Sequence, residues 1–204
     1  MSDNKGDTLL YFPTVVREVK IANAAEINSQ IEAGIDKIRE TEPNTLPEAW
    51  SCELYTTIGA PGTLKDHEEF KPLCDVIVEE ANAFAGILDL DIKFRPLIFT
   101  ECWLNIYGEG HAQEVHTHAN CVISGIYYAK APEGSGDLLI HSPYNDTMLD
   151  PPHARVNGFN MKMIPIKPEE GKMILFRSYV KHSVKPSKCQ DGEERISIAF
   201  NLTM

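Results

Sequence analysis

The second half of the chain consists of short segments that favour β-strands. Each of the eight segments is bounded by Gly, Pro, Asn or Asp. They span residues 93–107, 113–118, 121–130, 137–141, 161–166, 172–177, 180–184 and 194–203. Strands this short, separated by turn residues, predict an antiparallel sandwich or jelly roll. The long irregular stretch at 142–160 is typical of a lid or a binding loop.

The first half is predicted to contribute helices. Apolar residues recur every three or four positions over 24–39, and again over 66–85, which predicts two amphipathic helices. Residues 9–19 are rich in β-branched and aromatic side chains but include Pro13, so we expect an edge strand there. Residues 51–63 contain two glycines and a proline, which favours a loop with a short strand.

These segments fit one domain over residues 1–204, because all-β cores of this size are often a single unit. We expect a mainly β fold with flanking helices. The N-terminal strand and the two helices, within residues 1–90, would pack on a β core formed by residues 91–204.

Composition narrows the class of partner. The net charge of −11 makes nucleic acid an unlikely partner, since a nucleic-acid surface needs clustered Lys and Arg. The N-terminus is polar, no apolar run approaches the ~18 residues that cross a bilayer, and the five cysteines are scattered. We therefore expect a cytoplasmic protein with reduced thiols and no membrane contact.

Three histidines are the candidate metal ligands. His116 and His118 flank one threonine on a predicted strand, so their rings should share a face, and His182 follows in another β segment. By the same parity Glu114 could also face this site as a ligand or a supporting base. We expect a structural or supporting role for His111. Structural or surface roles are expected for the remaining histidines: His67, His141 and His153.

The last predicted strand carries a candidate anion-binding residue. Apolar side chains alternate along it, so Arg195, Ser197 and Ala199 share the face opposite an Ile/Ile/Phe face. A planar guanidinium suits bidentate binding of a carboxylate. Three protein ligands on one face of a metal, with an anion-binding residue beside it, would leave positions on the metal open for substrate and oxygen.

Five short motifs, in this order, resemble the 2-oxoglutarate/Fe(II)-dependent dioxygenases, and in particular a bacterial and phage group known mainly from sequence. They are Asn105-Ile-Tyr107-Gly108, His116-Thr-His118, Ser124-Gly-Ile-Tyr-Tyr128, Gly171…Phe176-Arg-Ser-Tyr-Val-Lys-His182 and Arg195-Ile-Ser197-Ile-Ala-Phe-Asn201. The resemblance covers about residues 98–204 and, more loosely, residues 12–16. It implies a double-stranded β-helix supported by the two N-terminal helices.

The resemblance also implies roles for individual residues. His116, His118 and His182 would ligate Fe(II). Arg195, with Ser197, would bind the distal carboxylate of 2-oxoglutarate, the co-substrate. Asn105 and Tyr107 resemble an Asn-x-Tyr pair that helps to bind the co-substrate, although a turn-forming Asn and a strand Tyr would look the same in sequence. The implied reaction hydroxylates a substrate and releases succinate and CO2.

One position departs from the pattern. Most of the superfamily carries Asp or Glu where this chain has His118. A neutral ligand leaves the ion with less compensating charge, so Fe(II) retention should be weaker. The sequence identifies no substrate and no oligomeric state, and the candidate specificity elements are the 142–160 loop, Arg177 and Tyr179.

Two other classes of protein account for parts of this pattern. A cupin-type three-histidine metalloprotein that does not use 2-oxoglutarate would explain Gly110 and the histidine pair. It expects a Glu where Val122 and Ile123 stand, and it gives Arg195 no role. A non-catalytic β-helix binding module would need neither Arg195 nor the three histidines.

Overall fold

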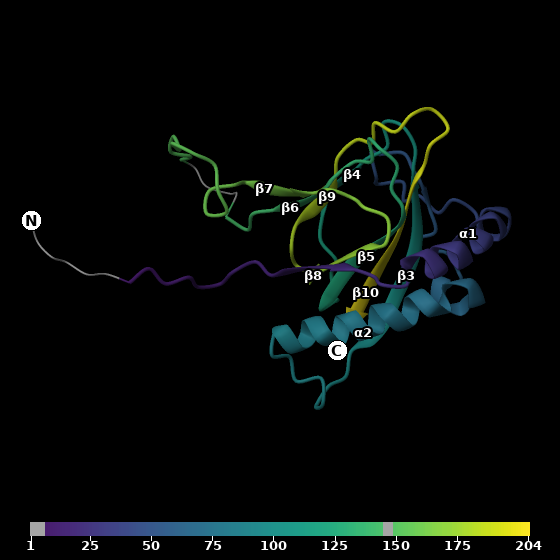
Figure 1. Ribbon diagram of the computed structural model, residues 1–204, viewed down its shortest axis with the longest axis horizontal. Helices are drawn as coiled ribbons and strands as arrows, with labels where there is room; N and C mark the ends of the chain where they lie inside the picture. The colour runs from purple at the N-terminus through teal and green to yellow at the C-terminus, as the bar shows by residue number, and fades with distance from the viewer. Residues whose placement is uncertain (1–6, 145–148) are drawn as a thin grey trace, which may run out of the picture.

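Two antiparallel β-sheets face each other in the computed structural model, which describes residues 7–144 and 149–204 (Figure 1). Six strands form one sheet in the order β1-β8-β5-β10-β3-β2, and four form the other in the order β4-β9-β6-β7. The strands are β1 (Val16–Lys20), β2 (Tyr55–Thr56), β3 (Ile98–Tyr107), β4 (Gln113–His116), β5 (Ile123–Lys130), β6 (Leu138–His141), β7 (Met163–Ile166), β8 (Lys172–Arg177), β9 (His182–Val184) and β10 (Arg195–Thr203).

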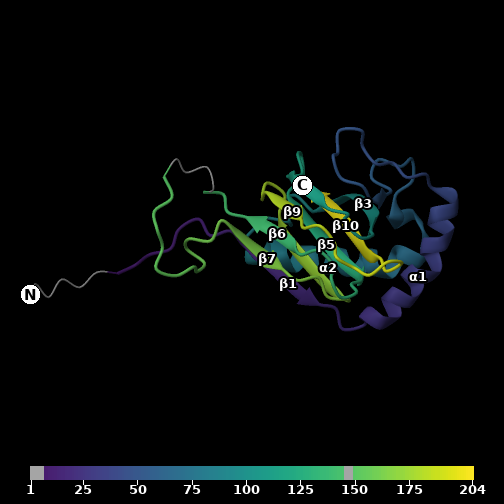
Figure 2. The same ribbon diagram turned by 90° about the horizontal axis from the view of Figure 1, so that it is seen from above.

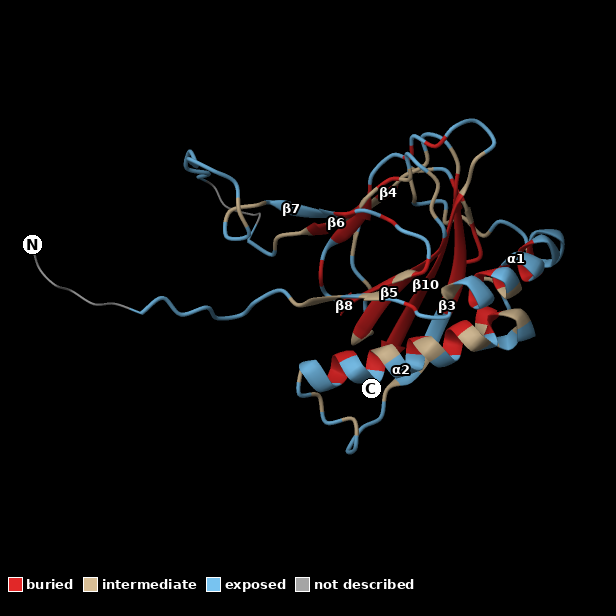
Figure 3. Cartoon of the chain, in the orientation of Figure 1, coloured by how far each residue is buried: buried red, intermediate tan, exposed pale blue. Residues whose placement is uncertain are grey.

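Two helices cover the outer face of the six-stranded sheet (Figures 1 and 2). They are α1 (Ala24–Thr41) and α2 (Lys71–Ile87), and two 3-10 turns, Leu64–Asp66 and Glu68–Phe70, precede α2. Each helix buries one stripe and exposes the other, as the alternating colours of Figure 3 show. This is the arrangement that the helical spacing of the isoleucines in α1 predicts.

The layers enclose two apolar clusters with the six-stranded sheet between them. The first cluster joins the helices to the sheet and includes Ile196, Ile198 and Phe200 of β10. The second lies between the two sheets and includes Tyr107 and Tyr128. Strand β10 is therefore covered on both faces, and eight of its nine residues are buried.

This arrangement is a double-stranded β-helix, or jelly roll, with two N-terminal helices supporting it, and it confirms the predicted fold class. The predicted alternation of β10 is also confirmed. Its Ile/Ile/Phe face packs on the helices, while Arg195 lies against the aromatic rings of the inner cluster.

Several predicted boundaries were wrong. The edge strand expected over 9–19 comprises only Val16–Lys20, because pairing with β8 starts at Val16 and residues 9–15 have no neighbouring strand in the described chain. The strand expected from residue 93 begins at Ile98. The strand expected over 113–118 ends at His116, and that over 180–184 begins at His182.

The long loop between β6 and β7 contains neither helix nor strand in its described parts, residues 142–144 and 149–160. Residues 145–148 of this predicted lid lie outside the described residues. Figure 2 shows the loop on the same side of the molecule as the N-terminal segment. Between them lies an open apolar groove of about 540 Å³.

Candidate metal and anion site

A cavity of about 230 Å³ lies between the two sheets. The six-stranded sheet contributes Trp103, Asn105, Tyr107, Phe176 and Ala199 to its wall, and the four-stranded sheet contributes Gln113, His116, His182 and Val184. His118 and Trp50 are among the loop residues that also line it. The cavity thus joins candidate metal ligands to an apolar and aromatic lining.

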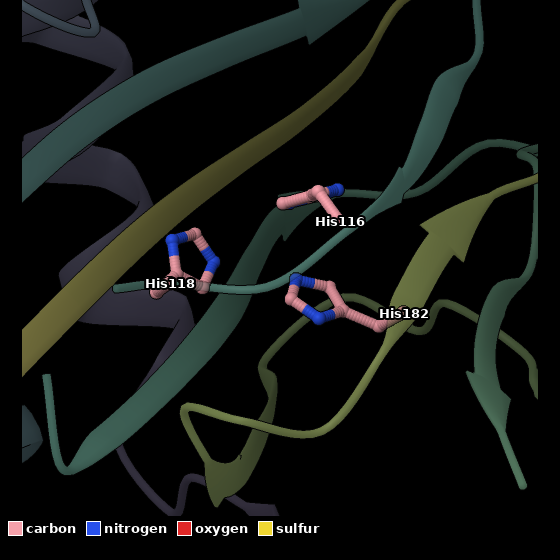
Figure 4. Close-up of side chains that lie close together, drawn as sticks. All are labelled: His116, His118 and His182. Atoms are coloured by element: carbon pink, nitrogen blue, oxygen red, sulfur yellow. The ribbon is translucent and has the colours of Figure 1, made fainter. Parts of the chain in front are cut away.

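The three candidate histidines converge on this cavity (Figure 4). His116 and His182 are paired across β4 and β9, with ring centroids 4.2 Å apart. His118 lies 5.2 Å from His116 and 5.1 Å from His182 by the same measure. One ligand atom from each residue lies within 4.8 Å of the others, a spacing that one ion could bridge.

Backbone carbonyls orient two of these rings. His116 Nδ1 lies 2.7 Å from the carbonyl oxygen of Glu114, and His182 Nδ1 lies 2.9 Å from that of Val180. A carbonyl only accepts hydrogen bonds, so Nδ1 carries the hydrogen in each ring and Nε2 keeps a free lone pair. This is the tautomer that histidine ligands commonly adopt at metal sites.

Burial also favours neutral rings. Burial, with a smaller contribution from nearby His116, lowers the pKa of His182 to about 3 and the pKa of His118 to about 4. Burial lowers the pKa of His116 as well, against the opposing effect of Glu114. The three rings are therefore uncharged at neutral pH, as metal ligation requires.

His118 is held differently from the other two histidines. It lies beyond the end of β4, and its backbone N–H donates to the carbonyl of Ser178 at 3.0 Å. The Trp103 ring packs against its imidazole at a centroid distance of 5.8 Å. Asn201 Nδ2 lies 3.4 Å from its Nδ1. The parity argument that placed His116 and His118 on one strand face was therefore wrong, because β4 ends before His118.

The parity argument was also wrong for Glu114. The register of β4 against β9 shifts between Gln113 and His116, which breaks the simple alternation. The Glu114 carboxylate accepts hydrogen bonds from the backbone N–H and the hydroxyl of Ser51, and the hydroxyl contact is the main reason its pKa is lowered. Glu114 contributes to the site through its backbone carbonyl, which orients His116.

Arg195 is buried among aromatic rings without an acceptor. Its side chain is 0% exposed, and Nε, Nη1 and Nη2 find no hydrogen-bond partner among the described residues. The guanidinium carbon lies 4.4 Å from the centroid of Tyr107 and 5.1 Å from that of Tyr128. A buried cation of this kind is costly unless an anion compensates it.

Two hydroxyls near Arg195 are also unpaired. Ser197 Oγ and Tyr128 OH are buried without a partner in the described chain, and these two residues face each other in the β10–β5 register. Burial raises the pKa of Tyr107 to about 12, so this neighbouring phenol remains protonated and uncharged. The region therefore offers hydrogen-bond donors in excess, which suits a carboxylate.

Asn105 is occupied by neighbours. With its amide oriented to satisfy them, its oxygen accepts from Trp103 Nε1 at 3.1 Å and its nitrogen donates to Thr56 Oγ1 at 2.7 Å. Asn105 still lines the cavity. Its polar atoms fix Trp103, the residue that packs on His118.

The remaining histidines have other partners, as expected. His111 Nδ1 accepts from the backbone N–H of Gly108 at 3.0 Å and closes a turn. His141 Nε2 lies 2.8 Å from Ser183 Oγ, and His153 lies 3.6 Å from Asp150. His67 contacts the ring of Phe70. None of these four belongs to the histidine group that could hold a metal within the described residues.

Sequence reasoning missed four residues of the site. Trp50 and Trp103 line the cavity, Tyr128 stacks on Arg195, and Asn201 contacts His118. The spacing of β10 gave one usable signal, because Asn201 continues the alternation that starts at Arg195. Trp50 carried no such signal, since it comes from a loop.

A family model described as "Putative 2OG-Fe(II) oxygenase" matches residues 101–201, the segment from β3 to β10 that contains the three histidines and Arg195. The chain belongs to the 2-oxoglutarate- and Fe(II)-dependent oxygenases. Fe(II) is the metal of this class of enzyme, and 2-oxoglutarate is its co-substrate.

Solved structures share the fold at low sequence identity. A prolyl-4-hydroxylase from Pseudomonas putida is 13% identical, with a TM-score of 0.58 over 93% of this chain and 92% of that one. The viral collagen prolyl hydroxylase of Paramecium Bursaria Chlorella virus-1, in complex with 2-oxoglutarate, is 16% identical, with a TM-score of 0.55 over 93% and 96%. HygX from Streptomyces hygroscopicus, with nickel, 2-oxoglutarate and hygromycin B bound, is 10% identical, with a TM-score of 0.61 over 93% and 83%.

No curated protein matches the chain by sequence. Among the described residues, no helix combines the length and apolar character needed to cross a membrane.

Proposed function

We propose that this protein hydroxylates a substrate in a reaction that converts 2-oxoglutarate and O2 to succinate and CO2. The observation that carries the proposal is the fully buried guanidinium of Arg195, whose three nitrogens lack acceptors among the described residues. A carboxylate would supply those acceptors in bidentate geometry. The nearby histidine group fits a metal that would bind the other end of a 2-oxo acid.

The donor set fits Fe(II). His116, His118 and His182 would hold the ion through three neutral imidazoles, a combination that suits first-row transition metals and leaves positions for 2-oxoglutarate and oxygen. When bound, Fe(II) would supply the redox chemistry that couples decarboxylation of 2-oxoglutarate to oxidation of the substrate.

The protein's own residues would position the co-substrate. Arg195 and Ser197 would bind its distal carboxylate, with the Tyr107 ring holding the guanidinium in place. Asn105 would act through Trp103, to which it is hydrogen-bonded. The apolar side chains Phe176 and Val184 would keep bulk water from the reacting end of the cavity.

Turnover without a known substrate is a practical first test. Purified protein is incubated with Fe(II), 2-oxoglutarate and O2, and succinate and oxygen consumption are measured together. We expect succinate to form in proportion to the oxygen consumed and His182→Ala to abolish it. A protein that binds iron and 2-oxoglutarate but never couples succinate to oxygen would contradict the proposal.

A comparison of 2-oxoglutarate with glutarate as ligands distinguishes an oxygenase from a cupin-type metalloprotein. Glutarate has the two carboxylates of 2-oxoglutarate without the keto group, so it is a matched control for chelation of the metal. We expect 2-oxoglutarate, in the presence of Mn(II), to raise the melting temperature more than glutarate does. A cupin-type centre would bind the metal with no added stability from 2-oxoglutarate.

Candidate substrate contacts lie near His118. Arg177 donates from Nε to the carbonyl of Val122 at 3.1 Å, and its guanidinium lies 5.6 Å from the ring of Tyr179. Tyr179 is 62% exposed and is one residue from Ser178, whose carbonyl binds the His118 backbone. We expect Arg177, Tyr179 and the described parts of the 142–160 loop to contribute to substrate choice.

A further inference from the structure

The hydrogen-bond polarity around the three histidines is not uniform. Nδ1 of His116 and Nδ1 of His182 each face a carbonyl oxygen, which only accepts. Nδ1 of His118 instead faces the amide nitrogen of Asn201, which only donates, at 3.4 Å. The same ring atom therefore meets opposite partners in the same site.

The orientation of the Asn201 amide is fixed by its other contacts. Its oxygen accepts from Ser124 Oγ at 2.7 Å, and its nitrogen donates to a carboxylate oxygen of Glu101 at 2.6 Å. An exchange of the amide oxygen and nitrogen would place oxygen against the Glu101 carboxylate. Asn201 is 2% exposed, so water offers little alternative, and its second N–H is left for His118.

A neutral imidazole carries one N–H, so the partner of one ring nitrogen decides the state of the other. Acceptance from Asn201 at Nδ1 places the hydrogen of His118 on Nε2. Figure 4 shows one ring nitrogen of His118 turned toward His182. The nitrogen that faces the proposed metal would then present a hydrogen where His116 and His182 present lone pairs.

We propose that Asn201 is a positioning residue that holds His118 in the Nε2–H tautomer and so makes it a weaker metal ligand than His116 and His182. The inference rests on the proposed function, in which the three histidines hold the metal. An N–H donor at this place suits an acceptor at position 118, and a carboxylate there could accept from Asn201 and ligate a metal at the same time. His118 can accept from the same donor only through its Nδ1 lone pair, and its hydrogen must then lie on Nε2.

The tautomers can be observed directly in the metal-free protein. Long-range ¹H–¹⁵N NMR spectra of ¹⁵N-histidine-labelled protein distinguish the two tautomers of each ring. We expect Nδ1–H for His116 and His182 and Nε2–H for His118. Asn201→Leu, which removes the donor at similar volume, should move His118 toward Nδ1–H. A wild-type His118 that carries its hydrogen on Nδ1 would overturn the role of Asn201.

Metal affinity provides the second readout, measured with Co(II) by titration of the visible absorption. We expect Asn201→Leu to bind Co(II) roughly fivefold more tightly, the equivalent of one ordinary hydrogen bond. The double variant Asn201→Asp with Glu101→Gln reverses the donor and acceptor in the contacts of position 201 with position 101 and with His118, while Ser124 can still donate to it, and it should bind about tenfold or more tightly. Glu101→Gln alone, whose amide oxygen can still accept from Asn201, is the matched control.

The outcomes separate this inference from the proposed function. Wild-type protein that binds no Co(II) would overturn the metal centre, whichever tautomer His118 shows. Tight Co(II) binding that is lost in His116→Ala but unchanged or weakened in the folded Asn201→Leu protein would overturn only the role of Asn201. In the expected case, His118→Ala costs less affinity in the wild type than in the double variant.

Discussion

Replacement of Arg195 by Met should test the proposed anion site most directly. Met keeps most of the length and apolar stem of Arg but removes the charge from a position that is 0% exposed. In the protein without a bound anion, the three guanidinium nitrogens have no acceptor among the described residues. We therefore expect the variant to be more stable than the wild type without ligand and to lose its response to 2-oxoglutarate.

The expected change in the free energy of unfolding follows from two opposing contributions. A buried charge without its partner costs about 3–5 kcal/mol. The rings of Tyr107 and Tyr128, at 4.4 and 5.1 Å, offset about 0.5–2 kcal/mol each. Together the two rings offset about 1–4 kcal/mol, so the midpoints of the two ranges favour Met by about 1.5 kcal/mol. In a chain of this size that corresponds to a rise in melting temperature of about 3–6 °C.

Calorimetry with Mn(II), with and without 2-oxoglutarate, measures these quantities. At a ligand concentration 100 times its Kd, the wild type should gain about 2.7 kcal/mol, or about 5–11 °C. Arg195→Met should bind at least ten times more weakly, on the order of a lost charged bidentate contact, and gain little. Arg95→Met, at an exposed position, is the control. A variant that is destabilised without ligand yet still stabilised by 2-oxoglutarate would refute the reasoning.

Three further predictions concern the surroundings of the site. Burial lowers the pKa of His118 to about 4 and that of His182 to about 3, so below the unfolded pKa near 6.5 the unfolded chain binds more protons than the folded protein. The free energy of unfolding of the metal-free protein, measured by urea denaturation, should therefore fall from about pH 6.5 to 4, by up to about 1.4 kcal/mol per pH unit for each ring. A flat pH profile would contradict this. Gly125→Ala should lower the unfolding free energy by about 1–3 kcal/mol, because its Cβ would lie 2.3 Å from the Phe200 ring; unchanged stability would mean that the core can shift. Glu114→Gln should leave Co(II) affinity within about twofold, whereas a loss of about tenfold would place Glu114 among the ligands.

The fold was largely predictable because its strands are short and bounded by turn residues. The predicted strand boundaries were wrong where pairing with a neighbouring strand, rather than residue propensity, decides where a strand begins or ends. Residues 9–15 have suitable side chains, but the pairing with β8 begins only at Val16, so they have no strand partner within the described chain, and residues 9–14 are exposed. Sequence periodicity describes one segment at a time and cannot predict where its neighbour ends.

The structure brings the three predicted histidines together, but by a geometry that differs in part from the predicted one. His116 and His182 meet because β4 and β9 pair in register, a long-range fact that no local pattern encodes. His118 reaches the cavity from beyond the strand end, held by Ser178, and parity along β4 does not apply to it. The register shift before His116 likewise turned Glu114 toward Ser51.

The proposed anion site combines residues that the sequence pattern identifies with neighbours that only the structure provides. Alternation along β10 was enough to place Arg195 and Ser197 on one buried face. Whether they are satisfied there depends on β3 and β5, which contribute Tyr107 and Tyr128 opposite them. Buried polar groups in proteins are almost always paired, yet the described side chains with unpaired buried atoms are Tyr128, Arg195 and Ser197. Because these exceptions lie on two adjacent strands and are all able to donate, one multidentate oxygen ligand accounts for them better than three separate defects, and a carboxylate is the simplest such ligand.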